Sequence, residues 1–148
     1  MYLVEEMHRH LSAQPFAWQG FREGLHYWEV RIDNGGDGGN FYIFIGVSSK
    51  PMRFDNYYPS DDSSWINCYN GGIYRGDQQL LRVEPIKTAG DRVGVLLDLN
   101  RQTLTFYRNG RLLGEATKSL TDGQTYFPFV GFHNTNTQVT LLFPGGPL

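Results

Sequence analysis

Only a few residues in this sequence have the type and spacing that chemistry at a protein site requires. His8 and His10 lie two residues apart and would share one face of a strand, a spacing that can ligate a metal ion. No cysteine, carboxylate or third histidine completes this pair at ligand spacing, so we expect no metal. The stretch DNGGDGGN, residues 33–40, is similar to an acidic calcium loop, but a flexible hairpin turn explains one short copy better.

Catalytic groups have equally little support. Asp61 and Asp62 could form an acid/base pair, but loop neighbours normally diverge, and SDDSS is typical of a solvated turn. Cys68, in WINCYNGG, lacks a nucleophile motif, which favours a small buried thiol on a strand. The sequence therefore indicates a protein that is not an enzyme and uses no cofactor.

The stretch GFHNTNTQ, residues 131–138, is a better candidate for a site. It leaves an apolar strand and presents Phe132, His133, Asn134 and Asn136 together. Such a loop combines an aromatic body with several amide donors and acceptors. An ordinary polar connection built from asparagine turns remains an equal alternative.

The elements that would position such loops are short strands. In EGLHYWEVRID, Trp28 and Val30 alternate with Tyr27 and Glu29, so this strand has two different faces. In residues 92–116 an alternating apolar strand is followed by a turn, a second strand and the hairpin signal Asn109-Gly110. Strands separated by turn signals at intervals of roughly 8–12 residues predict an antiparallel β-sandwich. FYIFIGVS and YFPFVGF are apolar on both faces, as in a sheet covered on both sides.

Two long segments show no strand pattern, and we expect them to be irregular. They are Lys50–Ser64 and Gly76–Gly90. Connections of this length inside a compact domain are usually functional. The first contains Phe54, Tyr57 and Tyr58, which either pack onto the sheet edge or contact a ligand.

Composition limits the function classes. The 148 residues form a single expected domain, 1–148, with its core in residues 20–143. A net charge of -2 argues against binding to nucleic acid or anionic membranes. One cysteine cannot form an internal disulfide, which favours a cytoplasmic or nuclear location. Nothing in the sequence suggests an obligate dimer, so we expect a monomer.

The chain resembles the SPRY domain family, which implies a bent, concanavalin-like jelly-roll sandwich used for protein interactions. The resemblance rests on GLHYWEVRI, IGVSS, GDRVGVLLDLNRQTLTFYRNGRLLG, YFPFVGF and QVTLLF, which follow one another in the family's order. MHRHLSAQ before GLHYWEV is similar to the start of the SPRY domains in SOCS-box and F-box substrate receptors of ubiquitin ligases.

In the SOCS-box group, three loops grip a short acidic, asparagine-containing peptide. The resemblance implies a partner site on three segments of this chain. Two departures stand out: Leu11 replaces the family's proline, and His133-Asn134-Thr135 replaces Val-Trp-Gly, removing a tryptophan of the kind that anchors interfaces. The implied set is Arg9, Leu11, Ala13, Arg53, Phe54, Tyr57, Tyr58, Phe132, His133, Asn134 and Thr135.

Two functions therefore compete. The first is a module that binds a short extended segment of a partner protein, plausible as the recognition domain of a ubiquitin ligase. The alternative is a lectin-like sandwich, in which aromatic rings stack on sugars beside amide and arginine groups. Its residues would be Trp65, Asn67, Tyr69 and Arg75.

Overall fold

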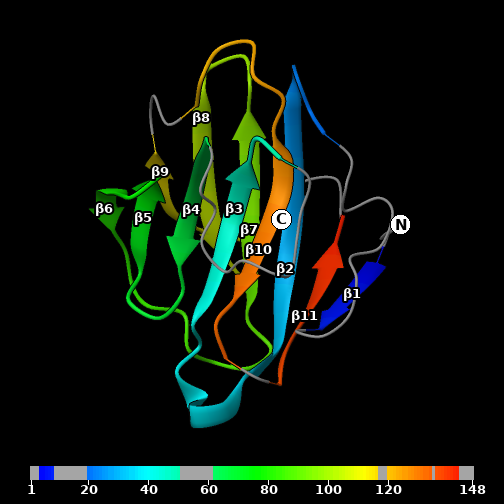
Figure 1. Ribbon diagram of the computed structural model, residues 1–148, viewed down its shortest axis with the longest axis vertical. Coiled ribbons are helices and arrows are strands. Elements are labelled where there is room, and N and C mark those ends of the chain that lie inside the picture. Colours follow the sequence, from blue (N-terminus) through cyan, green and yellow to red (C-terminus); the bar gives the residue numbers. More distant parts are fainter. Residues whose placement is uncertain (1–3, 9–19, 51–61, 117–119, 135, 144–148) are drawn as a thin grey trace.

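The computed structural model describes residues 4–8, 20–50, 62–116, 120–134 and 136–143. Within these residues two antiparallel sheets stack face to face, which confirms the predicted all-β sandwich (Figure 1). One sheet has six strands in the order β1-β11-β2-β7-β8-β9, and the other has five in the order β10-β3-β4-β5-β6. The strands are β1 (Val4–His8), β2 (Leu25–Gly35), β3 (Ile43–Ser48), β4 (Ser63–Asn67), β5 (Gly72–Arg75), β6 (Gln78–Arg82), β7 (Arg92–Asp98), β8 (Thr103–Arg108), β9 (Arg111–Ala116), β10 (Phe127–Phe132) and β11 (Thr137–Leu142), with a 3₁₀ helix at Asp37–Gly39.

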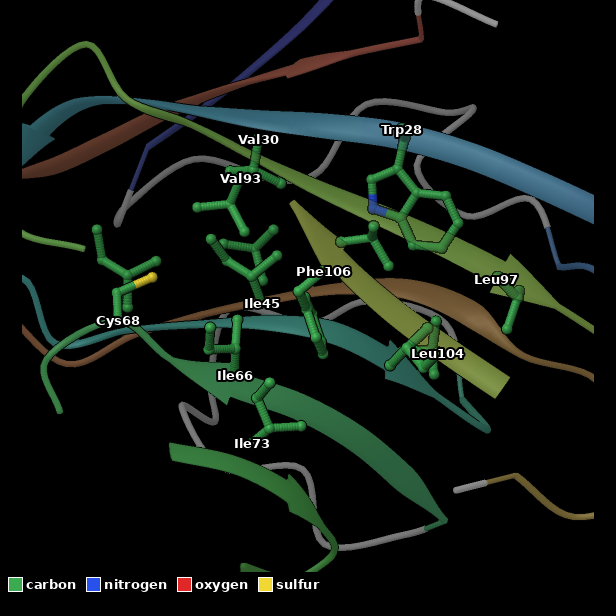
Figure 2. Close-up of a cluster of buried hydrophobic side chains, with 14 of the residues drawn as sticks. Trp28, Val30, Ile45, Ile66, Cys68, Ile73, Val93, Leu97, Leu104 and Phe106 are labelled. Atoms are coloured by element: carbon green, nitrogen blue, oxygen red, sulfur yellow. The ribbon is translucent and has the colours of Figure 1, made fainter. Parts of the chain in front are cut away.

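The core lies between the two sheets and follows from strand alternation. Trp28 and Val30 of β2 point inward and are almost completely buried. They face Ile45 and Ile66 of the opposite sheet (Figure 2). The two different faces predicted for this strand are confirmed, with Trp28 on the face between the sheets, and truncating such a side chain to alanine typically costs about 3–5 kcal/mol.

The β8–β9 hairpin forms at the predicted Asn109-Gly110 turn. Both residues have positive φ, 53° and 82°, which a type I′ turn requires and which asparagine and glycine tolerate best. The Asn109 side chain adds two hydrogen bonds, accepting from the Arg92 backbone N–H (2.9 Å) and donating to the Asp91 carboxylate (3.0 Å). The turn therefore also fixes the start of β7.

The five-stranded sheet is covered on both faces, as its apolar strands predict. Every residue of β3 is buried. Its outer face carries a second apolar cluster of Phe44, Trp65 and Phe129, each no more than 5% exposed. Phe44 meets Trp65 edge to face with centroids 5.2 Å apart. These aromatic side chains therefore belong to the packing of the sheet.

The six-stranded sheet has a polar cluster on its outer face. The Tyr27 hydroxyl donates to the Glu29 carboxylate (2.8 Å), which also accepts from Arg92 Nε (3.2 Å). Glu29 is only 5% exposed, so these two partners compensate for the burial of its charge. Gly94 leaves the space that the Tyr27 hydroxyl occupies, because a Cβ there would lie 2.2 Å from it.

The structure corrects the predictions for two segments, 33–40 and 76–90. Residues 33–40 do not form a hairpin turn, because β2 and β3 belong to different sheets and the chain crosses between them here. The segment 76–90 is not wholly irregular, because residues 78–82 form the edge strand β6, paired with β5.

The predictions around β4 also need correction. Ser63 and Ser64 lie inside β4 and are buried, so this part of SDDSS is not a solvated turn, and Ser60 and Asp61 lie outside the described residues. Cys68 is completely buried, as predicted, but it belongs to the turn after β4 and not to a strand. Of the predicted irregular segment 50–64, residues 51–61 lie outside the described part of the chain.

Candidate functional site

The lower end of the sandwich in Figure 1 includes the connections β2–β3, β4–β5, β6–β7, β8–β9 and β10–β11. The last of these carries the two predicted site residues whose side chains are described, His133 and Asn134. His133 is exposed, and its backbone N–H donates to the Tyr42 carbonyl (3.1 Å). Asn134 is half-buried, and its carbonyl accepts from the Thr137 hydroxyl (2.8 Å). The loop therefore follows the apolar strand β10, as its sequence predicts.

One polar group in this loop is unusual. The Asn134 Nδ2 is shielded from solvent and makes no hydrogen bond to any part of the chain that the structure describes. A buried amide donor without an acceptor costs roughly 1–3 kcal/mol. Only a rearrangement that exposes this donor would let an acceptor from outside the domain satisfy it.

The β10–β11 loop is fixed to the β2–β3 connection. Asn136 takes a positive φ of 65° and donates to both oxygens of the Asp37 carboxylate (3.1 and 3.2 Å). The sequence singled out Asn136 as part of a polar loop but offered no sign that Asp37 is its partner. This contact holds the predicted loop beside a segment that crosses between the sheets.

Next to His133 lies a row of side chains that the sequence did not predict to come together, and of these only Tyr69 was named, for the lectin-like alternative. The rings of Tyr42 and Tyr69 stack with centroids 4.2 Å apart, and the His133 ring meets Tyr42 edge to face at 5.1 Å. The Lys87 ammonium lies over the Tyr69 ring, 4.4 Å from its centroid. We call these four side chains the aromatic row. The two tyrosines are partly exposed, and His133 and Lys87 are exposed.

Backbone hydrogen bonds join the connections that carry the aromatic row. The Cys68 N–H donates to the Ile43 carbonyl (2.9 Å), and the Ile86 N–H donates to the Cys68 carbonyl (3.0 Å). Cys68 and Ile86 are both buried, and each precedes a residue of the row. The row is therefore built on a backbone network and not on independent loops.

Most other predicted site residues lie outside the described residues. These are Arg9, Leu11, Ala13, Arg53, Phe54, Tyr57, Tyr58 and Thr135, and the side chain of Phe132 is likewise not described.

The described residues next to 9–19 and 51–61 show where the chain enters each of these two segments. His8 pairs with Gln138, so the chain enters residues 9–19 at the lower end, beside the start of β11. The segment 51–61 begins and ends at the upper end, where the Ser49 N–H donates to the Asp62 carbonyl (2.8 Å).

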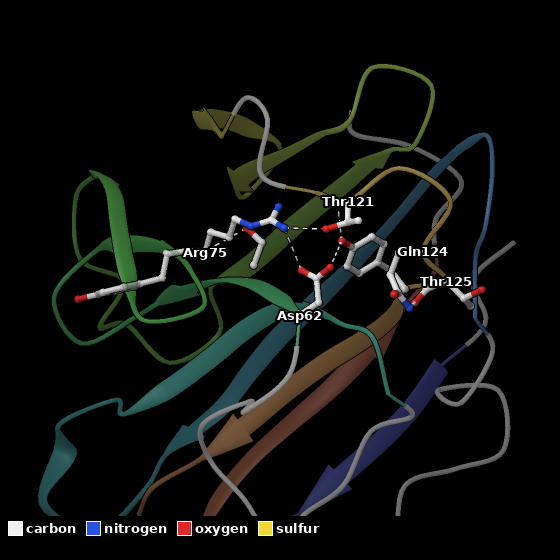
Figure 3. Close-up of polar contacts among 8 residues, drawn as sticks. Asp62, Arg75, Thr121, Gln124 and Thr125 are labelled. Carbon is white, nitrogen blue, oxygen red and sulfur yellow. Dashed lines mark hydrogen bonds and ion pairs between the residues drawn. The ribbon is translucent and has the colours of Figure 1, made fainter.

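The structure does not bring the lectin-like set together. Trp65 is buried at 4% exposure in the cluster on the outer face of the five-stranded sheet, so it offers no free ring to a sugar. Arg75 lies at the upper end, where it donates to the Thr121 hydroxyl (2.7 Å) and pairs with Asp62 at 3.4 Å (Figure 3). Tyr69 lies at the lower end.

Asp62 has a structural role at the upper end. Its carboxylate accepts from the hydroxyl of the buried Tyr126 (2.9 Å), and the same hydroxyl accepts from the Thr121 N–H (2.7 Å). Burial raises the pKa of the Tyr126 phenol above its usual value. A cavity of about 330 Å³ beside this network is lined by Asp62, Ser63, Arg75, Gly76, Asp77 and Gln78.

The only cysteine is shielded from reaction. Burial, followed by the nearby Asp91 charge, raises the pKa of the Cys68 thiol to about 12. A thiol with so little thiolate at neutral pH is a poor nucleophile. In the described part of the chain no group of three or more metal-binding side chains comes together, and no helix there is long and apolar enough to cross a membrane.

A sandwich that holds exposed rings and amides on joined connections at one end has the form of an interaction module. The SPRY domain model matches residues 25–146, and the chain belongs to this family of protein-interaction modules. This confirms the family that the sequence motifs indicate.

Curated relatives include F-box/SPRY domain-containing protein 1 of Drosophila virilis and of Drosophila persimilis. Each is 34% identical, over 87% and 96% of this chain respectively. The matches cover 54% and 60% of the relatives, so the chain spans little more than half of their length. The resemblance to F-box substrate receptors is therefore confirmed for the SPRY region.

Solved structures agree with the fold. The SPRY domain of human HERC1 matches with a TM-score of 0.68 at 25% identity, covering 84% of this chain and 77% of that one. The TRIM65 PSpry domain matches with a TM-score of 0.58 at 23% identity, covering 84% and 66%. The second likeness establishes the architecture alone.

Proposed function

We propose that this domain binds a short extended segment of a partner protein at the lower end of the sandwich. We further propose that it acts in this way as the substrate-recognition domain of a ubiquitin ligase. The observation that carries the proposal is the convergence of exposed rings and amides on hydrogen-bonded connections at one end. The F-box/SPRY relatives support the ligase context.

Two residues in the β10–β11 loop suit recognition of an extended chain. The exposed His133 ring offers a flat surface with polar nitrogens, and a rearrangement of the half-buried Asn134 would present its Nδ2 to a backbone carbonyl of the ligand. Arg9 follows β1 directly at this end and would supply charge-assisted hydrogen bonds to an acidic residue.

The strand register limits how Tyr58 can take part. Asp62 lies level with Ser49 and His133 with Tyr42, seven residues apart along β3, which is about 23 Å. Tyr58 precedes Asp62 by four residues, which span at most about 14 Å. A ligand that contacts both Tyr58 and His133 would therefore extend along the five-stranded sheet.

The test is an affinity purification from cell lysate with three forms of the domain. These are the unmodified domain, an Arg9→Ala/Tyr58→Ala double variant and an Arg22→Ala control at an exposed position of the upper end. We expect prey that is retained by the unmodified domain and the control and reduced at least thirtyfold by the double variant, the effect of losing one typical anchor residue. All forms must share one melting temperature.

The ligase context has its own readout. In cells that express the full-length protein, ubiquitination of the captured prey should fall when the double variant replaces the unmodified sequence. Prey bound equally by all forms would refute the site. Prey whose ubiquitination never changes would refute the ligase role and leave the binding role intact.

A further inference from the structure

We propose that the aromatic row of Lys87, Tyr69, Tyr42 and His133 docks an acidic, extended segment of the partner, with Lys87 as the anchor for a carboxylate. This inference rests on the proposed binding function and extends that site from His133 across the lower end, to Tyr42, Tyr69 and Lys87.

The charge of Lys87 favours an acidic ligand. Its ammonium lies over the Tyr69 ring, and no carboxylate of the described residues lies within ion-pair distance of it. The acidic residues nearest to Lys87 in sequence, Asp91 and Glu84, instead pair with Arg108, at 2.7 and 3.6 Å. An exposed cation without a carboxylate partner attracts a negative side chain of a ligand.

Hydrogen-bonding capacity in the row points the same way. The Tyr69 hydroxyl makes no hydrogen bond within the described part of the chain. It is therefore an available donor on the residue whose ring the ammonium covers. A carboxylate has two oxygens that can accept from the ammonium and from the hydroxyl. A basic ligand would instead meet the positive charge of Lys87.

Ring stacking argues against a sugar as the occupant. Tyr42 lies 4.2 Å and the Lys87 ammonium 4.4 Å from the Tyr69 centroid. A phenol ring has room for one such neighbour on each face, so both faces of Tyr69 are covered. Sugar stacking requires an open ring face, whereas a peptide can contact the exposed ring edges and hydroxyl.

The length and stiffness of the row fit an extended peptide. Three rings and an ammonium, with neighbouring groups 4.4, 4.2 and 5.1 Å apart, extend over at most about 14 Å, the length of about four extended residues. Hydrogen bonds between residues 43, 68 and 86, and between His133 and Tyr42, hold the carrying segments together. A surface ordered in advance loses less entropy when it binds.

The test uses random twelve-residue peptides selected by display on the unmodified domain, then synthesised for fluorescence polarisation. We expect the enriched peptides to carry an aspartate or glutamate. Lys87→Glu should weaken their binding at least tenfold, and Tyr69→Phe, which keeps the ring stack and removes the hydroxyl, about two- to fivefold. Lys50→Glu makes the same charge change at an exposed position of the upper end and should leave affinity within about twofold.

A charge exchange completes the test. Replacing the peptide's acidic residue with lysine should abolish binding to the unmodified domain and restore part of it to Lys87→Glu. Equal effects of Lys87→Glu and Lys50→Glu, or enriched peptides without acidic residues, would overturn the inference. Peptides lost with Arg9→Ala but not with Lys87→Glu would overturn it while the proposed function stands. Enrichment of no peptide at all would overturn both.

Discussion

The Gly94→Ala substitution tests the polar cluster on the outer face of the six-stranded sheet. Gly94 has no positive φ, so alanine is acceptable to the backbone and only the space matters. A Cβ at this position would lie 2.2 Å from the Tyr27 hydroxyl and 2.9 Å from its Cζ. The phenol must therefore retreat by about 1 Å, which breaks its 2.8 Å hydrogen bond to Glu29.

The cost can be worked out from two contributions. Losing a hydrogen bond to a buried charged group costs about 1.5–3 kcal/mol. Forcing a methyl group into a packed surface adds about 1–3 kcal/mol. We expect Gly94→Ala to lower the free energy of unfolding by about 3–5 kcal/mol, a large share of the roughly 5–15 kcal/mol of a typical domain.

Urea unfolding at pH 7, followed by tryptophan fluorescence, measures this change at constant m-value. The matched control is Gly114→Ala in β9, where a Cβ meets only flexible side-chain ends, the nearest being Leu81 Cδ1 at 3.0 Å. In a Tyr27→Phe background the 2.2 Å contact is gone, so Gly94→Ala should cost at least about 1 kcal/mol less. A cost below about 1 kcal/mol, or equal costs in both backgrounds, would refute the reasoning.

Three further predictions follow from buried or strained groups. Burial raises the pKa of the Tyr27 phenol above its usual 10.0, and the hydrogen bond and charge of Glu29 add to this shift. The protonated phenol therefore stabilises the fold below about pH 10, and this stability is lost as the pH rises further. Urea unfolding between about pH 9 and 11 should therefore show a steeper loss for the unmodified protein than for Tyr27→Phe. Burial raises the pKa of the Cys68 thiol from 9.0 to about 12. A thiol reagent at pH 8 should therefore modify the folded protein at least about a thousandfold more slowly than the urea-unfolded chain. Equal rates would contradict the burial of Cys68. Asn109→Ala removes two hydrogen bonds at a residue with φ of 53°, so we expect a loss of about 2–3 kcal/mol in urea, against less than about 0.5 kcal/mol for the exposed Arg111→Ala.

The sequence was most informative where one local signal decides the structure. Alternation places Trp28 inside because a strand with one polar face can orient in only one way against a core. The Asn109-Gly110 turn is likewise local, since both residues must adopt positive φ whatever surrounds them. These features need no knowledge of which strands become neighbours.

Predictions failed where the same local signal serves two arrangements. The turn residues in 33–40 are equally suited to a hairpin and to a crossing between sheets, and only the strand order decides. The edge strand β6 has no buried face to impose alternation, because Gln78, Gln79 and Leu80 are all exposed. An exposed edge therefore resembles an irregular segment in sequence.

The aromatic row could not be predicted because its members meet through long-range pairing. Tyr42 and Phe44 share a face of the chain two residues apart, yet Phe44 is 1% exposed while Tyr42 is partly exposed. The difference is position, since Phe44 lies inside β3 opposite Asn67, and Tyr42 precedes the strand. Tyr69 likewise follows β4 by two residues, held by the Asn67 side chain, which accepts from its N–H at 3.0 Å. Tyr42 and Tyr69 are therefore positioned by the backbone of the adjacent strands but stay partly exposed at the end of the sheet.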